Sequence, residues 1–245
     1  MQLRAMPGIG KHMFERELHS RLSAFTFRGL KANADFYDFF SIPVISTGRS
    51  FAYYRKIFFG NCSRREVLGT LEGKRVVDVG CGLTPYVSDS MFQACQKQGI
   101  EFFGVDPKFA EGFSLSPMDV AKIRAVGGRG KICRQAPGLE KCFGAFADDL
   151  PFDDGSIDLI LSNFLLYAWI QDEEVLESIY REFYRVLNNG GEVRIYPAPQ
   201  LDVDKIRYAG LREVMNQFEI RQRFSARWLN LAMYPPAYTM TMRKK

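Results

Sequence analysis

A glycine-containing turn is the clearest candidate for binding chemistry in this sequence. Residues 76–85 read Val-Val-Asp-Val-Gly-Cys-Gly-Leu-Thr-Pro, so Asp78, Gly80 and Gly82 end an apolar run typical of a strand. Glycine lets a ligand approach the backbone, and the free N–H groups of a following helix start favour a polar ligand. A third glycine at GxGxxG spacing is absent, which disfavours a dinucleotide site, and no GxxxxGK[ST] sequence indicates a Walker P-loop.

Asp106 is a second candidate because it ends the next strand-like run, residues 101–105. A carboxylate in that position can accept hydrogen bonds from two ribose hydroxyls, which suits an unphosphorylated ribose. The alternative is a strand-end Asp that makes the turn before Pro107. Ligands of open parallel sheets lie beyond the carboxyl ends of the strands, so we expect Asp106 and the glycine turn to share one edge.

Cysteine and histidine counts exclude several other kinds of site. There are five cysteines, none at CxxC spacing, so neither a disulfide framework nor a zinc ribbon is indicated. Buried thiols in a reducing compartment are the favoured interpretation. His12 and His19 are the two histidines of the sequence, which excludes a His-rich metal site, and we predict no bound metal.

From residue 74 onward, short apolar runs alternate with helical patterns. These predict strands at 75–79, 101–105, 143–147, 157–161, 192–196, 218–225 and 237–243, and helices at 84–98, 116–127, 172–187 and 202–217. A parallel crossover needs a dozen or more residues, so strands separated by helices are expected to pair in parallel. The last two strands are joined without a helix and are expected to pair antiparallel at the edge. The predicted fold class is α/β, a doubly wound sheet with an antiparallel end.

The first 73 residues predict helices rich in aromatic side chains. A helix over 11–30 would carry one apolar face, made by Phe14, Leu18, Leu22 and Phe25. Aromatic runs follow at 36–40 and 51–59, and Ser63 is a suitable N-cap for a helix over 64–71. Core positions are the favoured interpretation of most of these aromatics, and a substrate pocket is the alternative.

Charge is distributed unevenly along the 245 residues, a length that allows one large domain or two small ones. Residues 1–75 carry 13 Lys and Arg against 6 Asp and Glu, residues 76–199 carry 11 against 18, and residues 200–245 carry 9 against 4. An acidic middle with basic ends therefore underlies the net charge of +5. No apolar run reaches the length of a membrane span and no secretory signal pattern is present, so we expect a cytoplasmic protein without a membrane partner.

Four motifs in a fixed order give the sequence a family resemblance. They are the Asp78-x-Gly80-x-Gly82 turn, Asp106, residues 148–160 (Asp-Asp-Leu-Pro-Phe-Asp-Asp-Gly-Ser-Ile-Asp-Leu-Ile) and residues 181–191 (Arg-Glu-Phe-Tyr-Arg-Val-Leu-Asn-Asn-Gly-Gly). Over residues 74–245 the sequence resembles the class I S-adenosylmethionine-dependent methyltransferases. The resemblance implies a Rossmann-like seven-stranded sheet with an antiparallel last strand, S-adenosyl-L-methionine as cofactor, and methyl transfer by in-line displacement.

The resemblance also implies roles for residues at the cofactor's methionine and ribose ends. Gly80 and Gly82 would pass beneath the methionine part. Asp78 would brace that loop and face the methionine amino group. Asp106 would hold the ribose, and Asn163, after the fourth strand, would face the methionine end.

The adenine contacts implied by the resemblance fall on residues 146–150. Asp148, Asp149 and Leu150 lie in the segment that lines adenine in the family. The family's usual acidic adenine contact falls on Phe146, which is a departure from the pattern. Either Asp148 substitutes for it or Phe146 stacks on the ring.

In this fold the substrate is usually covered by N-terminal helices and loop insertions. We therefore expect residues 1–73 to form a helical lid over a cofactor-binding core of residues 74–245, with the connection 107–146 as a further candidate. The aromatic lid favours a small aromatic or apolar metabolite that is methylated on O, N or S.

Four residues are candidates near that substrate. Tyr54 and Arg55 are expected to approach the cofactor carboxylate. His19 is the best-placed base in the lid, and Tyr167 is expected to line the pocket beyond the fourth strand. A general base is optional in this chemistry, because aligning the nucleophile in a dry site lowers much of the barrier.

Two alternatives remain open from the sequence. The basic ends favour a methyltransferase that acts on RNA or protein. However, Asn163-Phe-Leu-Leu lacks the prolines of the [DN]PP[YF] signature of amino-group methylation, so a nucleic-acid substrate is the less favoured partner. The unusual Phe146 and the absent third glycine favour a non-catalytic protein built on the same fold. The sequence does not predict an oligomeric state.

Overall fold

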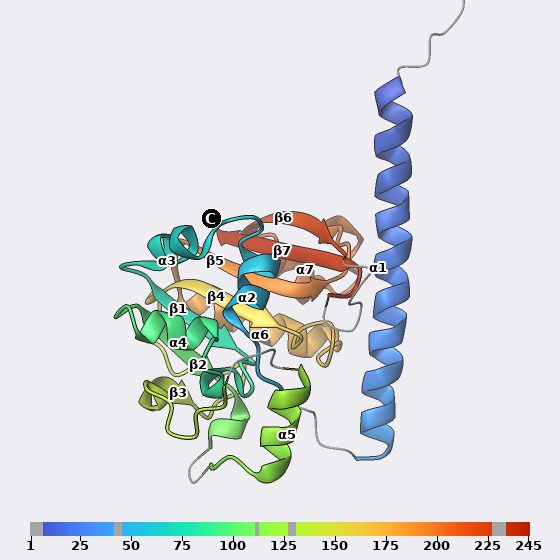
Figure 1. Ribbon diagram of the computed structural model, residues 1–245. Helices are drawn as coiled ribbons and strands as arrows, with labels where there is room; N and C mark the ends of the chain where they lie inside the picture. Colours follow the sequence, from blue (N-terminus) through green and yellow to red (C-terminus); the bar gives the residue numbers. More distant parts are fainter. Residues whose placement is uncertain (1–6, 42–45, 111–112, 127–130, 227–233) are drawn as a thin grey trace, which may run out of the picture.

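A seven-stranded mixed sheet forms the centre of the molecule (Figure 1). The computed structural model describes residues 7–41, 46–110, 113–126, 131–226 and 234–245. The strands are β1 (Arg75–Val79), β2 (Glu101–Val105), β3 (Cys142–Phe143), β4 (Ile157–Asn163), β5 (Leu187–Ala198), β6 (Phe218–Ser225) and β7 (Ala237–Lys244). Their order is β3-β2-β1-β4-β5-β7-β6, with β1 to β5 parallel and β7 antiparallel to both β5 and β6. The predicted doubly wound sheet with an antiparallel end is confirmed.

Helices cover both faces of the sheet, which makes three layers (Figure 1). The helices are α1 (Pro7–Phe39), α2 (Phe51–Phe58), α3 (Arg64–Leu71), α4 (Met91–Gln96), α5 (Pro117–Val126), α6 (Glu173–Val186) and α7 (Ala209–Met215). One buried cluster joins α2, α3 and α4 to one face of the sheet, and a second joins α6 and α7 to the other. Branched and aromatic side chains of the strands supply the sheet's share of both clusters, as expected for a sheet buried on two faces.

The N-terminal helix starts agree with their capping residues. Ser50 caps α2 by accepting from the Tyr53 N–H, and Ser63 forms a capping box with Glu66 at the start of α3. Gly60 and Gly73 then adopt positive φ after α2 and α3, a conformation that favours glycine. The predicted helix over 64–71 is confirmed.

The predicted helix over 84–98 is wrong in its first half. Thr84–Tyr86 form a single 3₁₀ turn, and α4 begins at Met91 because the Ser90 side chain accepts from the Gln93 N–H. Between them the chain pairs with residues 131–133, as Val87 bridges Ile132. A later Ser cap and a long-range bridge thus replaced the N-cap expected at Thr84, and no long helix starts at the glycine turn.

Two further elements are shorter than predicted. The third strand has two residues, at the edge of the sheet, where pairing on one side gives it little support. The helix expected over 202–217 is a 3₁₀ turn at Val203–Lys205 followed by α7.

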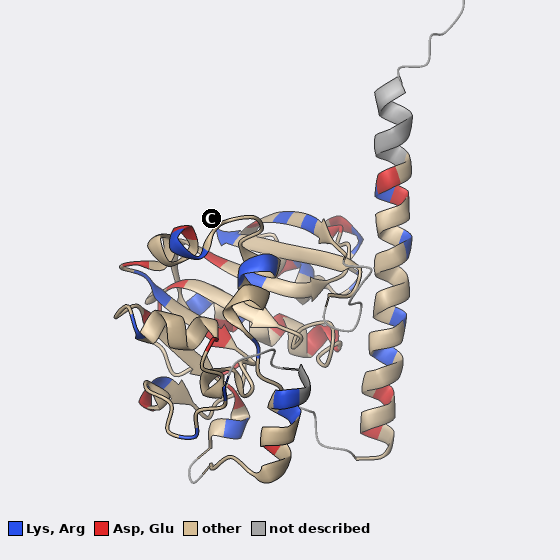
Figure 2. Ribbon diagram, in the orientation of Figure 1, with Lys and Arg blue, Asp and Glu red and all other residues tan. Residues whose placement is uncertain are grey.

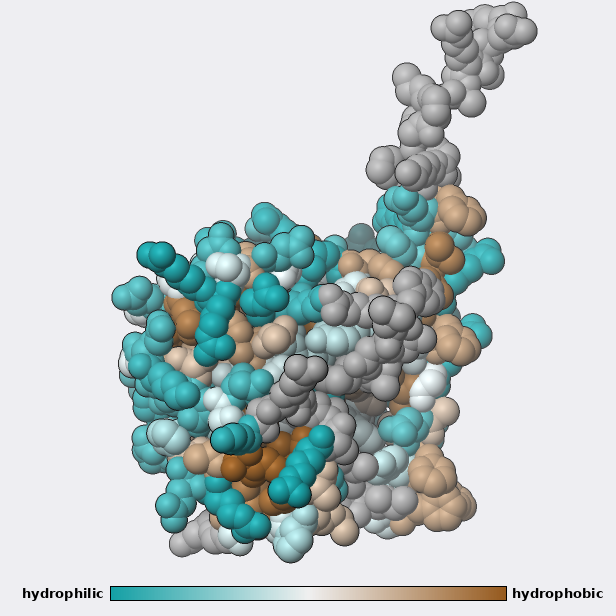
Figure 3. Space-filling model, in the orientation of Figure 1, coloured by the Kyte–Doolittle hydropathy of each residue, from teal (hydrophilic) through white to brown (hydrophobic). Residues whose placement is uncertain are grey.

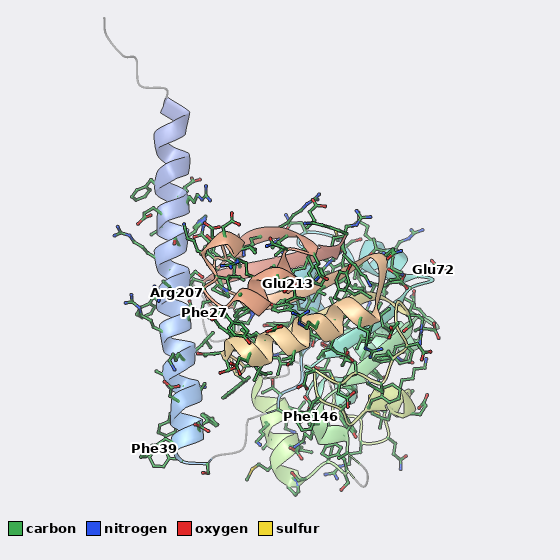
Figure 4. The ribbon with its side chains drawn as sticks, turned by 180° about the vertical axis from the view of Figure 1, so that it is seen from behind. Phe27, Phe39, Glu72, Phe146, Arg207 and Glu213 are labelled. Atoms are coloured by element: carbon green, nitrogen blue, oxygen red, sulfur yellow. The ribbon has the colours of Figure 1, made fainter. Side chains whose placement is uncertain are left out.

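α1 runs along one side of the domain, and its N-terminal part extends past the sheet (Figure 1). Phe27 lies on the side that faces the domain and packs against both core clusters (Figure 4). The apolar face predicted for this helix instead points outward, since Phe14 and Phe25 are 69% and 75% exposed. Figure 3 shows apolar side chains along the exposed length of this helix. Both sides of α1 carry apolar side chains. The apolar face that the sequence indicated is the one that does not contact the core.

Within the described residues, no helix has both the length and the apolar character that crossing a membrane requires.

Candidate functional site

The carboxyl ends of β1, β2 and β4 meet a folded-back stretch of the N-terminal segment, residues 46–58. Leu83 donates its N–H to the Thr47 carbonyl at 3.0 Å, and the Arg49 N–H donates to Thr84 Oγ1 at 3.3 Å. Residues 47–49 therefore lie directly on the turn that follows β1, and they wall the site that the strand ends create.

The turn needs its glycines for contacts within the protein. Gly80 and Gly82 have φ values of +74° and +53°. A Cβ atom at Gly82 would lie 2.7 Å from the Thr47 carbonyl oxygen, and one at Gly80 would lie 3.0 Å from the Leu165 side chain. Thr47 and Leu165 therefore occupy the space where a Cβ atom of Gly82 or Gly80 would lie. The sequence alone leads us to expect a ligand in that space.

Asp78 lies buried beneath this turn, with one oxygen bound and one free. The Tyr54 hydroxyl donates to its Oδ2 at 2.6 Å, while Oδ1 has no hydrogen-bond partner among the described residues. Burial raises the pKa of the Asp78 carboxyl to about 7. The nearby Asp106 adds to this rise and the Tyr54 hydrogen bond opposes it. A buried acceptor left without a partner is a candidate ligand contact.

Arg49 is a candidate site residue that the sequence patterns did not indicate. Its side chain is 7% exposed, and within the described part of the chain its Nε and Nη1 have no hydrogen-bond partner. The guanidinium lies 5.0 Å from the Tyr53 ring centroid and 5.3 Å from that of Phe164. Its sequence signal is weak: one arginine among small residues, directly before an aromatic helix.

Arg55, the arginine that the sequence favoured, lies elsewhere. It is half-buried and its Nη1 donates to the Cys62 carbonyl, beyond the far end of α2. Tyr54, by contrast, reaches the carboxylate of Asp78. The structure therefore separates this predicted pair, because adjacent helix positions point in different directions.

Asn163 ends β4 next to the Asp78 strand. Its side chain is buried, and its Oδ1 accepts from the Tyr53 hydroxyl at 3.2 Å. Two adjacent tyrosines of α2 thus reach the ends of two adjacent strands, β1 and β4. This arrangement fixes residues 51–54 against the sheet at the site.

Asp106 is held by the backbone and keeps acceptor capacity. Its Oδ2 accepts from the Gly82 N–H and its Oδ1 from the Lys108 N–H, both at 3.0 Å. Each carboxylate oxygen therefore retains a lone pair. Burial raises the pKa of the Asp106 carboxyl, and the two backbone hydrogen bonds oppose that rise.

The segment expected at adenine is anchored to α6. Glu182 accepts from the Leu150 N–H at 2.7 Å, and Arg185 donates to the Phe152 carbonyl and to Asp154. Leu150 is buried, whereas Asp148 and Asp149 are exposed and Phe146 is 67% exposed (Figure 4). The exposed Phe146 ring has no stacking partner among the described side chains.

The two residues suggested as catalytic lie outside this group. The Tyr167 hydroxyl is buried and bonded to the Tyr180 hydroxyl at 2.8 Å, and burial raises its pKa well above the ordinary value. His19 stacks on Phe224 of β6 at 3.9 Å. Because β6 is four strands from β1, at about 4.8 Å a strand, His19 lies roughly 19 Å from the Asp78 strand. Neither placement favours a general base.

The free buried groups fit S-adenosylmethionine, the cofactor implied by the family resemblance. Its methionine part carries one ammonium and one carboxylate, and its ribose carries two hydroxyls. Asp78 offers an anionic acceptor, Arg49 offers cationic donors, and Asp106 offers free lone pairs. The residues present therefore match this cofactor in charge and in hydrogen-bond type.

Comparisons with known proteins were made for the whole chain. Residues 77–195 match a family model described as a methyltransferase domain. Among solved structures, an S-adenosylmethionine-dependent methyltransferase of Methanosarcina mazei is similar at 17% identity, over 73% of this chain and 96% of that one, with a TM-score of 0.42. One from Archaeoglobus fulgidus is also 17% identical, over 79% and 99% of the two chains, with a TM-score of 0.42. No curated protein sequence matches the chain.

The match begins within β1 and ends within β5, so it spans the parallel strands and the glycine turn. Those strands, in the order β3-β2-β1-β4-β5, carry Asp78 and Asp106 at the positions that the resemblance requires. Over residues 77–195 the chain matches a methyltransferase domain, in agreement with the resemblance to the class I, S-adenosylmethionine-dependent family.

Proposed function

We propose that this enzyme methylates an O, N or S atom of a small aromatic or apolar metabolite, which binds beneath the N-terminal segment. S-adenosylmethionine supplies an electrophilic methyl group when bound. In this proposal Arg49 binds its carboxylate, Asp78 faces its ammonium and Asp106 accepts from its ribose hydroxyls. Asn163 and the two α2 tyrosines keep these groups in place.

The observation that carries the substrate class is a cavity of about 490 Å³ between the C-terminal end of α1 and the loop after β4. Tyr37 and Trp169 line it and pack edge to face, with ring centroids 5.3 Å apart. Charged side chains also line it: Lys31, which is paired with Asp35 at 2.9 Å, Asp38 and Asp172. The same loop places Leu165 against Gly80. The volume falls within the range of roughly 300–1,000 Å³ typical of small-molecule pockets.

The side chains around the site support catalysis by alignment and exclusion of water. Tyr53, Phe164 and the aliphatic Leu165 surround the methionine end with apolar surface. A dry site of this kind holds a nucleophile in line with the methyl group without a dedicated base.

Radiolabelled S-adenosylmethionine tests the proposal directly. The purified protein is incubated with a panel of small phenols, thiols and aromatic amines, and in parallel with RNA and with protein. We expect label in a small acceptor, and we expect Trp169→Ala to raise KM for that acceptor without changing cofactor affinity. Phe39→Ala is the matched control, since this α1 side chain is 81% exposed. Label found only in RNA or protein would refute the proposal.

A further inference from the structure

A second cavity lies at the edge of the sheet opposite the cofactor site. Its volume is about 890 Å³, and it is lined by the end of α3, the loop after α2, the residue before β1, the first parts of β4 and β5, Arg223 of β6 and the end of β7. Because β1, β4 and β5 are parallel and β7 is antiparallel to them, the starts of these parallel strands and the end of β7 share one edge, while Arg194 and Arg223 lie further along the sheet. The site at Asp78 and Asp106 lies beyond the other ends of the same strands.

Four cationic side chains from four different parts of the chain line this cavity: Lys74, Arg194, Arg223 and Arg243. Figure 2 shows Lys and Arg gathered on β6, β7, α2 and α3 on this side of the molecule. Lys74 of the basic first segment and Arg223 and Arg243 of the basic last segment therefore line the same cavity.

Three of the four cations form no ion pair with the described residues, although Arg243 lies opposite Glu192 and Glu219 in the strand register and its charge lowers the pKa of Glu219. Arg194 is paired with Glu192 at 2.7 Å, but Lys74, Arg223 and Arg243 have no carboxylate within 4 Å among the described residues. The next arginine along β6, Arg221, does have a partner, since it binds Glu219 at 2.7 Å.

The two carboxylates that line the cavity already form hydrogen bonds or ion pairs within the protein. Asp158 accepts from the Arg75 N–H and from the Asn188 side chain, and Glu192 is bound to Arg194. With four cations against these two carboxylates, the cavity keeps a net charge of about +2. Unpaired guanidinium groups around a concave surface favour phosphate, which they bind in a bidentate geometry.

The spacing of the cations suits a ligand of nucleotide size. Arg223 is opposite Thr239 in the β6–β7 register, and Arg243 lies four residues further along β7, about 14 Å at 3.4 Å per residue. Lys74 precedes β1, three strand spacings from β7, which is again about 14 Å. Phe58 and Phe59 supply apolar surface to the wall of the cavity, and Asn61 and Asn189 supply amide groups.

A purely structural role explains two of these cations but not the others. Arg223 donates to the Ile57 carbonyl at 2.7 Å and Arg194 to the Phe58 carbonyl at 3.2 Å, so both stabilise the C-terminal end of α2. Lys74 and Arg243 form no side-chain hydrogen bond with the described residues. These two carry the argument for a ligand.

We propose that this cavity is a second binding site, which takes a small nucleotide-sized ligand with at least two phosphate groups. Arg243 and Lys74 would bind the phosphates, with Arg223 contributing from the third side. The site is separate from the methyl-transfer site and does not depend on the acceptor proposed above.

Calorimetric titration with inorganic pyrophosphate tests this site in the intact protein. We expect saturable binding that Arg243→Gln weakens about 10- to 100-fold, as expected for loss of a charge-assisted hydrogen bond, and that Lys74→Gln also weakens. Arg221→Gln is the matched control, because it removes the same charge from the same face outside the cavity. All variants should bind S-adenosylmethionine like the unmutated protein, which also shows that they are folded.

Three outcomes would overturn the proposal. One is the absence of pyrophosphate binding. Another is equal weakening by Arg221→Gln and Arg243→Gln, which would indicate a diffuse basic face. The last is a single-stranded RNA oligonucleotide that binds while pyrophosphate does not compete, which would assign the face to nucleic acid.

Discussion

The hydroxyl of Tyr54 donates a 2.6 Å hydrogen bond to the buried carboxylate of Asp78. One partner belongs to the aromatic N-terminal segment and the other to the first strand of the sheet. The neighbouring Tyr53 makes the equivalent connection to Asn163. The proposed cofactor site is thus built jointly by the sheet and by residues 46–58.

Cofactor affinity should depend on pH through Asp78. In the free protein its pKa is raised to about 7, and an ammonium group beside it favours the ionised form, so binding releases a proton below that pH. We expect affinity to rise from about pH 6 to 8 and then level off, and Asp78→Asn to abolish this slope. Calorimetry in buffers of different ionisation enthalpy measures the released proton. A flat profile in the unmutated protein would contradict the assignment.

The same carboxyl should make the free protein less stable as pH rises. Its folded pKa lies above the ordinary value of 3.8, so the folded state binds the proton more tightly than the unfolded state. The free energy of unfolding should therefore fall between about pH 4 and pH 7 and then stop falling. Urea unfolding of Asp78→Asn against the unmutated protein isolates this contribution. An unchanged pH profile in the variant would assign the slope to other groups.

Arg49→Met should weaken cofactor binding without lowering the stability of the protein. Loss of a charge-assisted contact predicts about tenfold or weaker cofactor binding. The melting temperature should not fall, because the variant removes a buried charge whose Nε and Nη1 lack partners among the described residues. Arg55→Gln is the control and should leave cofactor affinity unchanged. If Arg55→Gln weakened binding and Arg49→Met did not, the roles assigned here would be reversed.

Asp106→Ala should remove most cofactor affinity. Two hydrogen bonds to a carboxylate, at roughly 1.5–3 kcal/mol each, predict a loss of about 100-fold or more. Asp204→Ala is a suitable control because its side chain is exposed and lies outside the proposed site. Fluorescence or calorimetric titration with S-adenosylhomocysteine measures both. Equal losses in the two variants would place the ribose elsewhere.

Gly104→Ala should destabilise the protein through the packing between β1 and β2. An added Cβ would lie 3.0 Å from Cys81 Sγ and 3.3 Å from Cys142 Sγ, and overpacking of this kind costs about 1–3 kcal/mol. Gly69→Ala, in α3, meets no atom within 4 Å and should stabilise by about 0.5–1 kcal/mol. Urea unfolding compares the two. A Gly104→Ala variant as stable as the parent would show that the thiols move aside freely.

The sequence predicted the sheet well because each strand is a local apolar run between turn residues. The second strand was predicted at 101–105 and is observed at Glu101–Val105, and Asp106 follows from that placement. Spacing along the chain also placed Asp78 and Asn163 at the ends of neighbouring strands.

The remaining features depend on contacts between residues that are far apart in the sequence, and local sequence patterns could not predict them. Arg49 enters the site because residues 47–49 fold back on the turn at 83–84, some 35 residues away, and no local pattern encodes that return. Tyr167 lies in the core, where its hydroxyl is hydrogen-bonded to that of Tyr180 on α6. The outward face of α1 was misassigned because both sides of the helix are apolar, and contact with the sheet alone decides which one is buried.

The hydrogen bond between Tyr53 and Asn163 joins two residues that leave the ribosome at different times. Its two residues are 110 positions apart, so at about 5–20 residues per second the hydroxyl emerges roughly 5–20 seconds before its acceptor. A nascent chain that already holds Tyr54 and Asp78 still lacks the strand that completes the methionine end of the site. The ability to hold the methyl donor should therefore arise late, in a single step, when β4 joins the sheet.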